Sequence, residues 1–187
     1  PTVSNQMATL KGSGADTFFN VTTPKWAAQA IKGAAELGWK PTHYLNSVSS
    51  SVGSVMVPAG AENGIGVISS NYFKDPADPA WANDKGFLEY KAWMEKNMPG
   101  LNLAEGFYTS GYVHAAAIHK VIEQAGDNLT RKNIMKQAAS LNFTNGMLLP
   151  GVKFQTSATD FYPIENKQLM RWNGKSWELF GDVLGPQ

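Results

Sequence analysis

Short apolar runs alternate with a helical pattern over the first 70 residues, and this alternation constrains the fold more than any other feature. Strand-like runs are expected at 17–21, 42–45 and 65–70, and the segment 24–37 places its apolar residues at helical spacing. That helix has a proline in its first turn and Gly38 just beyond its end, the usual distribution of these two residues. The pattern predicts an open α/β sheet with helices between its strands.

Polar turns follow the first two of these strands. Thr22 and Thr23 come after the first strand, and Asn46 and Ser47 come after the second. Ligands of open α/β sheets bind outside the carboxyl ends of the strands, so these four side chains are candidate ligand contacts. Each has a local alternative: Thr22 and Thr23 could simply cap the helix, and Asn46 and Ser47 could simply form a turn.

The charges of the chain are nearly balanced, with 16 Lys and Arg against 15 Asp and Glu. This balance gives no electrostatic reason to expect a nucleic acid or an anionic membrane as a partner. The absence of cysteine excludes disulfides, thiol catalysis and thiolate metal sites. No run approaches the ~20 apolar residues of a membrane span, and no signal peptide is present. The chain opens on Pro1 without a Met, so we expect a processed or truncated piece of a longer protein.

The segment 74–79 combines Pro and Asp in a way that interrupts regular structure, and we interpret it as a crossover between two units. After it, three helices and then several strands are expected. Asn173-Gly174 is a two-residue hairpin signal between the last two strands. The remaining expected elements are helices at 2–14, 50–57, 84–97, 110–124 and 130–140, and strands at 152–156, 168–172 and 177–180.

Neither catalysis nor metal binding has a convincing motif. His114 and His119 are five residues apart, whereas two helical metal ligands need a spacing of three or four. The sequence Gly12-Ser13-Gly14 matches neither a phosphate-binding loop nor a nucleophile elbow. No base, nucleophile and orienting group share one neighbourhood. The sequence therefore predicts a protein that is not an enzyme and uses no metal or cofactor.

Several sequence segments resemble those of a known family: GAD before the first strand, ELGWKP, GDNLTRKNIMKQAASL, TSATDFYPI and RWNGKSWELFG. Together they resemble the solute-binding proteins of ABC importers, of the type that carries leucine, isoleucine and valine. This is the type I periplasmic-binding-protein class, and the resemblance covers the C-terminal part of such a protein, from Thr2 to about Val183.

The resemblance implies two Rossmann-like α/β lobes, joined by three crossovers, with the ligand held between them. Residues 1–73 would belong to the second lobe, 74–146 would supply helices of the first lobe, and 147–187 would return to the second lobe and end in a hairpin. The N-terminal half of the protein, with half of the binding site, would be missing. The helices of 84–140 should then show uncovered apolar faces, and the segment 152–156 should lie beside the first three strands.

The resemblance also bears on the ligand. Members that bind amino acids place an acidic side chain after the strand at 42–45, to hold the ligand ammonium group, but here Asn46 and Ser47 occupy that turn. Neutral side chains cannot offset the cost of burying an ammonium group. We therefore expect the ligand to be a small carboxylate. The resembling segments are closest in sequence to the branch of the family that is associated with aromatic compounds. Tyr72, Phe107 and Tyr108 are expected either to line the pocket or to pack in the hinge and core.

The function implied is that of an extracytoplasmic, periplasmic binding protein, which closes on its ligand and delivers it to a membrane permease. Two alternatives remain open at this point. A ligand-sensing regulatory or receptor domain has the same fold and signals by the same closure. An α/β enzyme with an active site between lobes belongs to a different class, and turnover of an ester or amide would reveal it.

Overall fold

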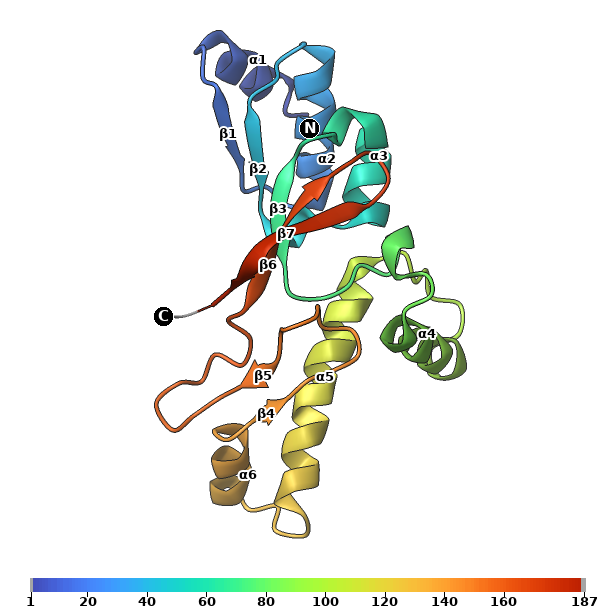
Figure 1. The fold of residues 1–187 in the computed structure, drawn as a ribbon, viewed down its shortest axis with the longest axis vertical. Coiled ribbons are helices and arrows are strands. Elements are labelled where there is room, and N and C mark those ends of the chain that lie inside the picture. Colours follow the sequence, from blue (N-terminus) through green and yellow to red (C-terminus); the bar gives the residue numbers. More distant parts are fainter. Residues whose placement is uncertain (1, 186–187) are drawn as a thin grey trace.

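The computed structural model describes residues 2–185 and is drawn in Figure 1. A five-stranded sheet with helices behind it forms one end of the molecule, and a helical body with a small two-stranded sheet forms the other (Figure 1). The helices are α1 (Ser4–Gly12), α2 (Pro24–Glu36), α3 (Val57–Ala59), α4 (Lys85–Asn97), α5 (Gly106–Ala125) and α6 (Arg131–Ala138). Shorter helical turns are η1 (Ser47–Ser49), the π-helical η2 (Val52–Met56), η3 (Ala61–Gly64) and η4 (Pro79–Trp81).

The large sheet has the strand order β1-β2-β3-β6-β7. Its first three strands are parallel, whereas β6 runs antiparallel to β3 and β7 antiparallel to β6. The strands are β1 (Thr17–Asn20), β2 (Thr42–Leu45), β3 (Ile68–Asn71), β6 (Lys167–Trp172) and β7 (Trp177–Leu184). Helix α2 is the crossover between the parallel strands β1 and β2. The expectation of an α/β fold is confirmed.

One face of this sheet is buried under α2, η2 and α3. Ala27 and Ile31 of α2 pack with Met56 of η2 and with Trp172 of β6, and all four are almost fully buried. The indole N–H of Trp172 donates to the carbonyl of Ala61 at 2.7 Å, so the largest buried side chain also satisfies its polar atom.

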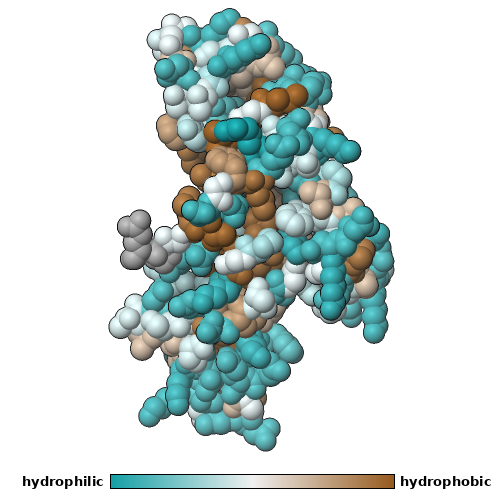
Figure 2. Space-filling model, in the orientation of Figure 1, coloured by the Kyte–Doolittle hydropathy of each residue, from teal (hydrophilic) through white to brown (hydrophobic). Residues whose placement is uncertain are grey.

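The opposite face of the sheet has no helical layer among residues 2–185. Phe19 of β1 and Tyr44 of β2 are direct cross-strand partners with stacked rings, yet Phe19 is 70% exposed and Tyr44 is 38% exposed. Figure 2, in the orientation of Figure 1, shows apolar residues gathered in the middle of the view, where the strands lie. Parallel strands are ordinarily covered on both faces, so this face is incomplete.

The helical body has a core of its own. Tyr90 and Met94 of α4, Val113 of α5 and Phe154 are buried together, separately from the cluster on the sheet. Several large apolar side chains of α4 and α5 remain outside that core and are about half exposed or more: Leu88, Trp93, Ile118 and Ile122. The expectation of uncovered apolar helix faces is confirmed.

One detail of the expected topology is wrong, and the expected hairpin is confirmed with a longer loop. The segment 152–156 does not join the large sheet: β5 (Phe154–Gln155) pairs with β4 (Asn142–Phe143), because Phe154 stacks on Phe143 in the helical core. The chain rejoins the large sheet only at Lys167. The hairpin at Asn173-Gly174 is present, but its loop spans 173–176, since Trp172 pairs with Trp177 and Asn173 bonds across the loop.

Candidate functional site

Two crossover segments, 71–75 and 145–149, join the sheet to the helical body and lie side by side. The N–H of Lys74 donates to the carbonyl of Met147 at 2.8 Å, and the N–H of Leu149 donates to the carbonyl of Tyr72 at 2.9 Å. Phe73 and Leu148 form an isolated antiparallel bridge between these two bonds. The two units are therefore connected by a short hydrogen-bonded ribbon.

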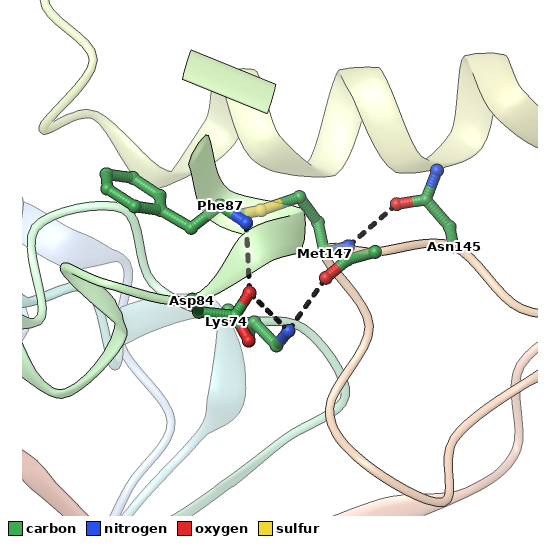
Figure 3. A network of polar contacts seen from close by, with 6 residues as sticks. Lys74, Asp84, Phe87, Asn145 and Met147 are labelled. Atoms are coloured by element: carbon green, nitrogen blue, oxygen red, sulfur yellow. Dashed lines mark hydrogen bonds and ion pairs between the residues drawn. The ribbon is translucent and has the colours of Figure 1, made fainter. Parts of the chain in front are cut away.

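A buried ammonium group ties this ribbon to the start of α4 (Figure 3). Lys74 Nζ donates to Asp84 Oδ1 at 2.7 Å and to the carbonyl of Gly146 at 2.8 Å, and Asp84 Oδ1 also accepts from the N–H of Phe87. Partial desolvation raises the pKa of the Asp84 carboxyl, but the bonds from Lys74 and Phe87 outweigh it and hold the pKa below its ordinary value. A Cβ at Gly86 would lie 2.1 Å from the Gly146 oxygen, so only glycine permits this approach.

A cavity of about 290 Å³ opens between the two units, beside the ribbon. One wall comes from the turn after β2, including Ser47, Ser50 and Ser51. Another is the crossover that leaves β3, and a third is the first turn of α5. The cavity thus lies at the carboxyl ends of β2 and β3, where the strand order of an open α/β sheet places ligands.

Three of the seven side chains singled out from the sequence line this cavity: Ser47, Tyr72 and Phe107. They come from the turn after β2, the crossover after β3 and the start of α5. Phe107 is 55% exposed, so its ring is available for contact. The fold therefore brings together residues that are 60 positions apart in the chain.

Thr22, Thr23 and Asn46 do not line the cavity. The hydroxyl of Thr22 donates to Asn20 Oδ1 at 2.7 Å, and Asn46 Nδ2 donates to the carbonyls of Thr22 and Asn20. These bonds fasten the turn after β1 to the turn after β2. Thr23 is the residue before α2, but its side chain makes no capping hydrogen bond. Contact between these three residues and a ligand stays a prediction.

Tyr108 lies in a different hollow, a groove of about 800 Å³ between α4 and α5. Its other walls include Trp93, Met98 and Tyr112, so the groove is largely apolar. The two aromatic residues in the first turn of α5 thus differ in position. Phe107 lines both the cavity and the groove, whereas Tyr108 lines the groove and not the cavity.

Two carboxylates in the cavity wall were not expected from the sequence as site residues. Asp75 is 6% exposed, and its two oxygens accept the N–H groups of Val52 and Ala77 at 2.8 Å each. Burial raises the pKa of Asp75 to about 6, although these backbone hydrogen bonds oppose the shift. Glu105 accepts from the hydroxyl of Ser54 at 2.8 Å. The carboxylate oxygens of both residues thus accept hydrogen bonds from other groups of this protein.

Among the described residues that line the cavity, Lys167 is the one with a cationic side chain. It begins β6, and the pairing of Gln168 with Asn71 sets it beside the end of β3. Its Nζ lies 3.5 Å from Ser47 Oγ and 6.0 Å from the centre of the Tyr72 ring. No local motif marks Lys167, because only the antiparallel pairing of β6 with β3 carries it to this place.

Among residues 2–185 no group of three or more His, Asp or Glu side chains is arranged to hold a metal ion. Within the same range, no helix combines the length and apolar character needed to cross a membrane. His43 of β2 is buried, and its ring contacts Phe18 and Asn20 of the neighbouring strand. Desolvation lowers the pKa of His43 to about 4. It is a core residue.

Comparison with known structures supports the fold assignment. The structure of a branched-chain amino acid ABC transporter protein from Thermus thermophilus, with bound valine, matches with a TM-score of 0.83 at 16% identity, over 98% of this chain and 50% of that one. A substrate-binding protein from Aeropyrum pernix matches with a TM-score of 0.76 at 14% identity, over 98% and 48%. A fatty acid ABC transporter substrate-binding protein from Thermomonospora curvata gives 0.68 at 16%, over 100% and 47%.

The chain thus spans about half the length of the solved structures that it matches. No curated protein matched it. The fold is that of a type I periplasmic binding protein. A family model described as periplasmic binding protein matches residues 2–176, which is most of the sequence. The chain belongs to the periplasmic binding protein family.

Proposed function

We propose that this chain is part of an extracytoplasmic solute-binding protein that serves an ABC importer. The observation that carries the proposal is the cavity between the sheet and the helical body, whose walls come from both units. A ligand there would contact Ser47 on one side and Phe107 on the other, so it would favour the closed arrangement of the units. Closure about the ribbon of 71–75 and 145–149 would present a distinct surface to a membrane permease.

The ligand class that we propose is a small carboxylate, and specifically an aromatic acid. The turn at Asn46 and Ser47 holds no acid for a ligand ammonium group, and the two carboxylates of the cavity, Asp75 and Glu105, accept hydrogen bonds from their own chain. Tyr72 and Phe107 offer ring surface on which an aromatic body can pack.

We also propose that the rest of a longer protein covers the two apolar surfaces left open here. These are the outer face of the sheet, with Phe19 and Tyr44, and the groove between α4 and α5, with Trp93. In the lobe division proposed from the sequence, the helices of 84–140 belong to the first lobe, whose strands lie in the N-terminal half; that the same half also reaches the outer face of the large sheet is part of the present proposal. The solved relatives are about twice as long as this chain, which supports such a cover.

Calorimetry on the full-length protein tests the ligand class. The panel is leucine, valine, benzoate, 4-hydroxybenzoate and a phenylpropenoate, and we expect binding of at least one aromatic acid and none of the amino acids. An ion pair at ~4 Å is worth several kcal/mol in a partly desolvated cleft, and a hydroxyl cannot replace it. Micromolar binding of leucine without any response to the aromatic acids would overturn the proposal.

A charge substitution tests the position of the ligand. Ser47→Asp should weaken carboxylate binding, since it adds a negative charge to the cavity wall. Thr130→Asp adds the same charge at the residue before α6, where Asp is as suitable as Thr, and outside the cavity. We expect the first variant to lose affinity and the second to retain it. Equal affinity in Ser47→Asp and the wild type would show that Ser47 does not face the ligand.

The proposed cover is tested by two substitutions in the full-length protein. Phe19 lies on the uncovered face of the large sheet and is 70% exposed. Val57 lies in α3, on the other side of the sheet, and is 61% exposed. If the rest of the protein buries Phe19, Phe19→Ser should lower the free energy of unfolding by about 1.5–3 kcal/mol. Val57→Ser should change it by no more than about 0.5 kcal/mol. Equally small effects of both would contradict the cover.

A further inference from the structure

Lys167 has an ammonium group in the cavity wall whose hydrogen-bonding capacity is largely unused. Within residues 2–185 no carboxylate lies within 4.0 Å of its Nζ. Its one hydrogen bond goes to the hydroxyl of Ser47, at a long 3.5 Å. An ammonium group carries three N–H donors, so two of them remain for a ligand or for water.

The acids of the same cavity are in the opposite situation. Asp75 is buried and accepts two backbone N–H bonds, and Glu105 accepts a hydroxyl and the N–H of Phe107. The oxygens of these acids thus already accept hydrogen bonds from the protein, whereas Lys167 has N–H donors without an acceptor among residues 2–185. The charge still available to a ligand at this wall is therefore positive.

The surroundings of Lys167 define how a ligand would lie. Its Nζ is 6.0 Å from the centre of the Tyr72 ring, at the end of the cavity formed by the sheet. Phe107 lies at the opposite wall, on α5. A carboxylate at Lys167 would place the remainder of the molecule across Tyr72 and towards Phe107.

We infer that Lys167, together with the hydroxyl of Ser47, holds the carboxylate of the ligand at the sheet side of the cavity and selects acids over neutral analogues. This inference rests on the proposed function, and it adds the residue that sets the charge preference and the direction in which the ligand is bound. An ammonium group on the ligand would be repelled from the same wall, so an α-amino acid could not place its amino group beside Ser47.

The test uses the full-length protein and pairs of acids with their amides: benzoate with benzamide, 4-hydroxybenzoate with 4-hydroxybenzamide, and octanoate with octanamide. The amide keeps the shape of the acid and removes the charge. We expect Lys167→Met to weaken binding of the preferred acid by about 10- to 100-fold, the range for hydrogen bonds to charged groups, and to leave the affinity for its amide within about twofold. Lys167→Arg should restore most of the acid affinity.

Lys175→Met is the matched control. It removes the same charge from the exposed hairpin loop, outside the cavity, and should change neither affinity. Equal loss of acid and amide binding in Lys167→Met would assign a structural role to Lys167 and overturn the inference. An unchanged acid affinity would also overturn it, while the proposed ligand class would stand. Failure of the wild type to bind any acid of the panel would overturn both proposals.

Discussion

The contact between Gly86 and Gly146 can be tested by adding one methyl group. A Cβ at Gly86 would lie 2.1 Å from the Gly146 oxygen and 2.5 Å from its carbonyl carbon, whereas real Cβ atoms essentially never come within 3.0 Å of another heavy atom. The two backbones must therefore separate by roughly 1 Å, and neither is a flexible side chain that could yield at low cost. The Gly86→Ala substitution thus acts on the attachment of α4 to the ribbon.

The magnitude follows from what that displacement breaks. Lys74 Nζ lies 2.8 Å from the same Gly146 oxygen, so a shift of this size removes a charge-assisted hydrogen bond. Such a bond contributes about 1.5–3 kcal/mol, and overpacking adds about 1–3 kcal/mol. Alanine returns up to about 1 kcal/mol through its higher helix propensity. We expect a net loss of about 1.5–5 kcal/mol in the free energy of unfolding, or roughly 3–20 °C in Tm.

Urea unfolding and thermal melting of the same protein measure this effect, and hydrogen exchange of the Phe87 amide reports whether α4 has loosened. Gly12→Ala is the matched control, because Gly12 ends α1 and a Cβ there would meet nothing within 4 Å. It should leave stability unchanged or raise it by up to about 1 kcal/mol. A Gly86→Ala protein as stable as the wild type would refute the reasoning from the Gly86–Gly146 contact.

Three further predictions concern the ribbon, the cavity wall and the core. Lys74→Met should lower the free energy of unfolding in urea by about 3–5 kcal/mol, because it removes two charge-assisted hydrogen bonds made by a side chain that is 8% exposed. An unchanged midpoint would contradict this. Burial raises the pKa of Asp75 to about 6 from 3.8, so its stabilising contribution is complete below pH 3.8 and is lost as the pH rises through 6. His43, whose pKa is lowered to about 4, acts in the opposite direction over the same pH range, so the quantity to measure is the stability of the wild type relative to that of Asp75→Asn. In urea unfolding between pH 4 and 7 this difference should fall by up to about 3 kcal/mol, at about 1.4 kcal/mol per pKa unit, and a difference that does not change with pH would rule Asp75 out. Trp172→Phe should cost about 1–3 kcal/mol by calorimetry, because it leaves a cavity and removes a buried indole hydrogen bond, and an unaltered Tm would count against the packing described.

The sequence determined the local elements of this protein. Proline in the first turn of α2 and Gly38 beyond its end fixed that helix to within a residue, because the φ preferences of Pro and Gly act within one turn. The positions of β1 and β2 follow from their short apolar runs, although the face that each buries does not, since Asn20 and His43 are buried while Phe19 is exposed. The hairpin at Asn173-Gly174 follows from its turn residues. The polar turn at Ser47 was also visible, since the carboxyl ends of adjacent strands meet at one edge of a sheet.

The tertiary structure decided which of these residues meet. Phe154 left the predicted strand position beside β3 because it stacks on Phe143 in the core of the helical body, and that preference is set by packing partners distant in sequence. Lys167 reaches Ser47 through the antiparallel pairing of β6 with β3, across 120 residues of chain. Local propensity carries no information about such pairings, because their free energy arises only when the partner surfaces are already in place. The chain's elements are thus a property of its sequence, whereas the charge of its cavity is a property of its fold.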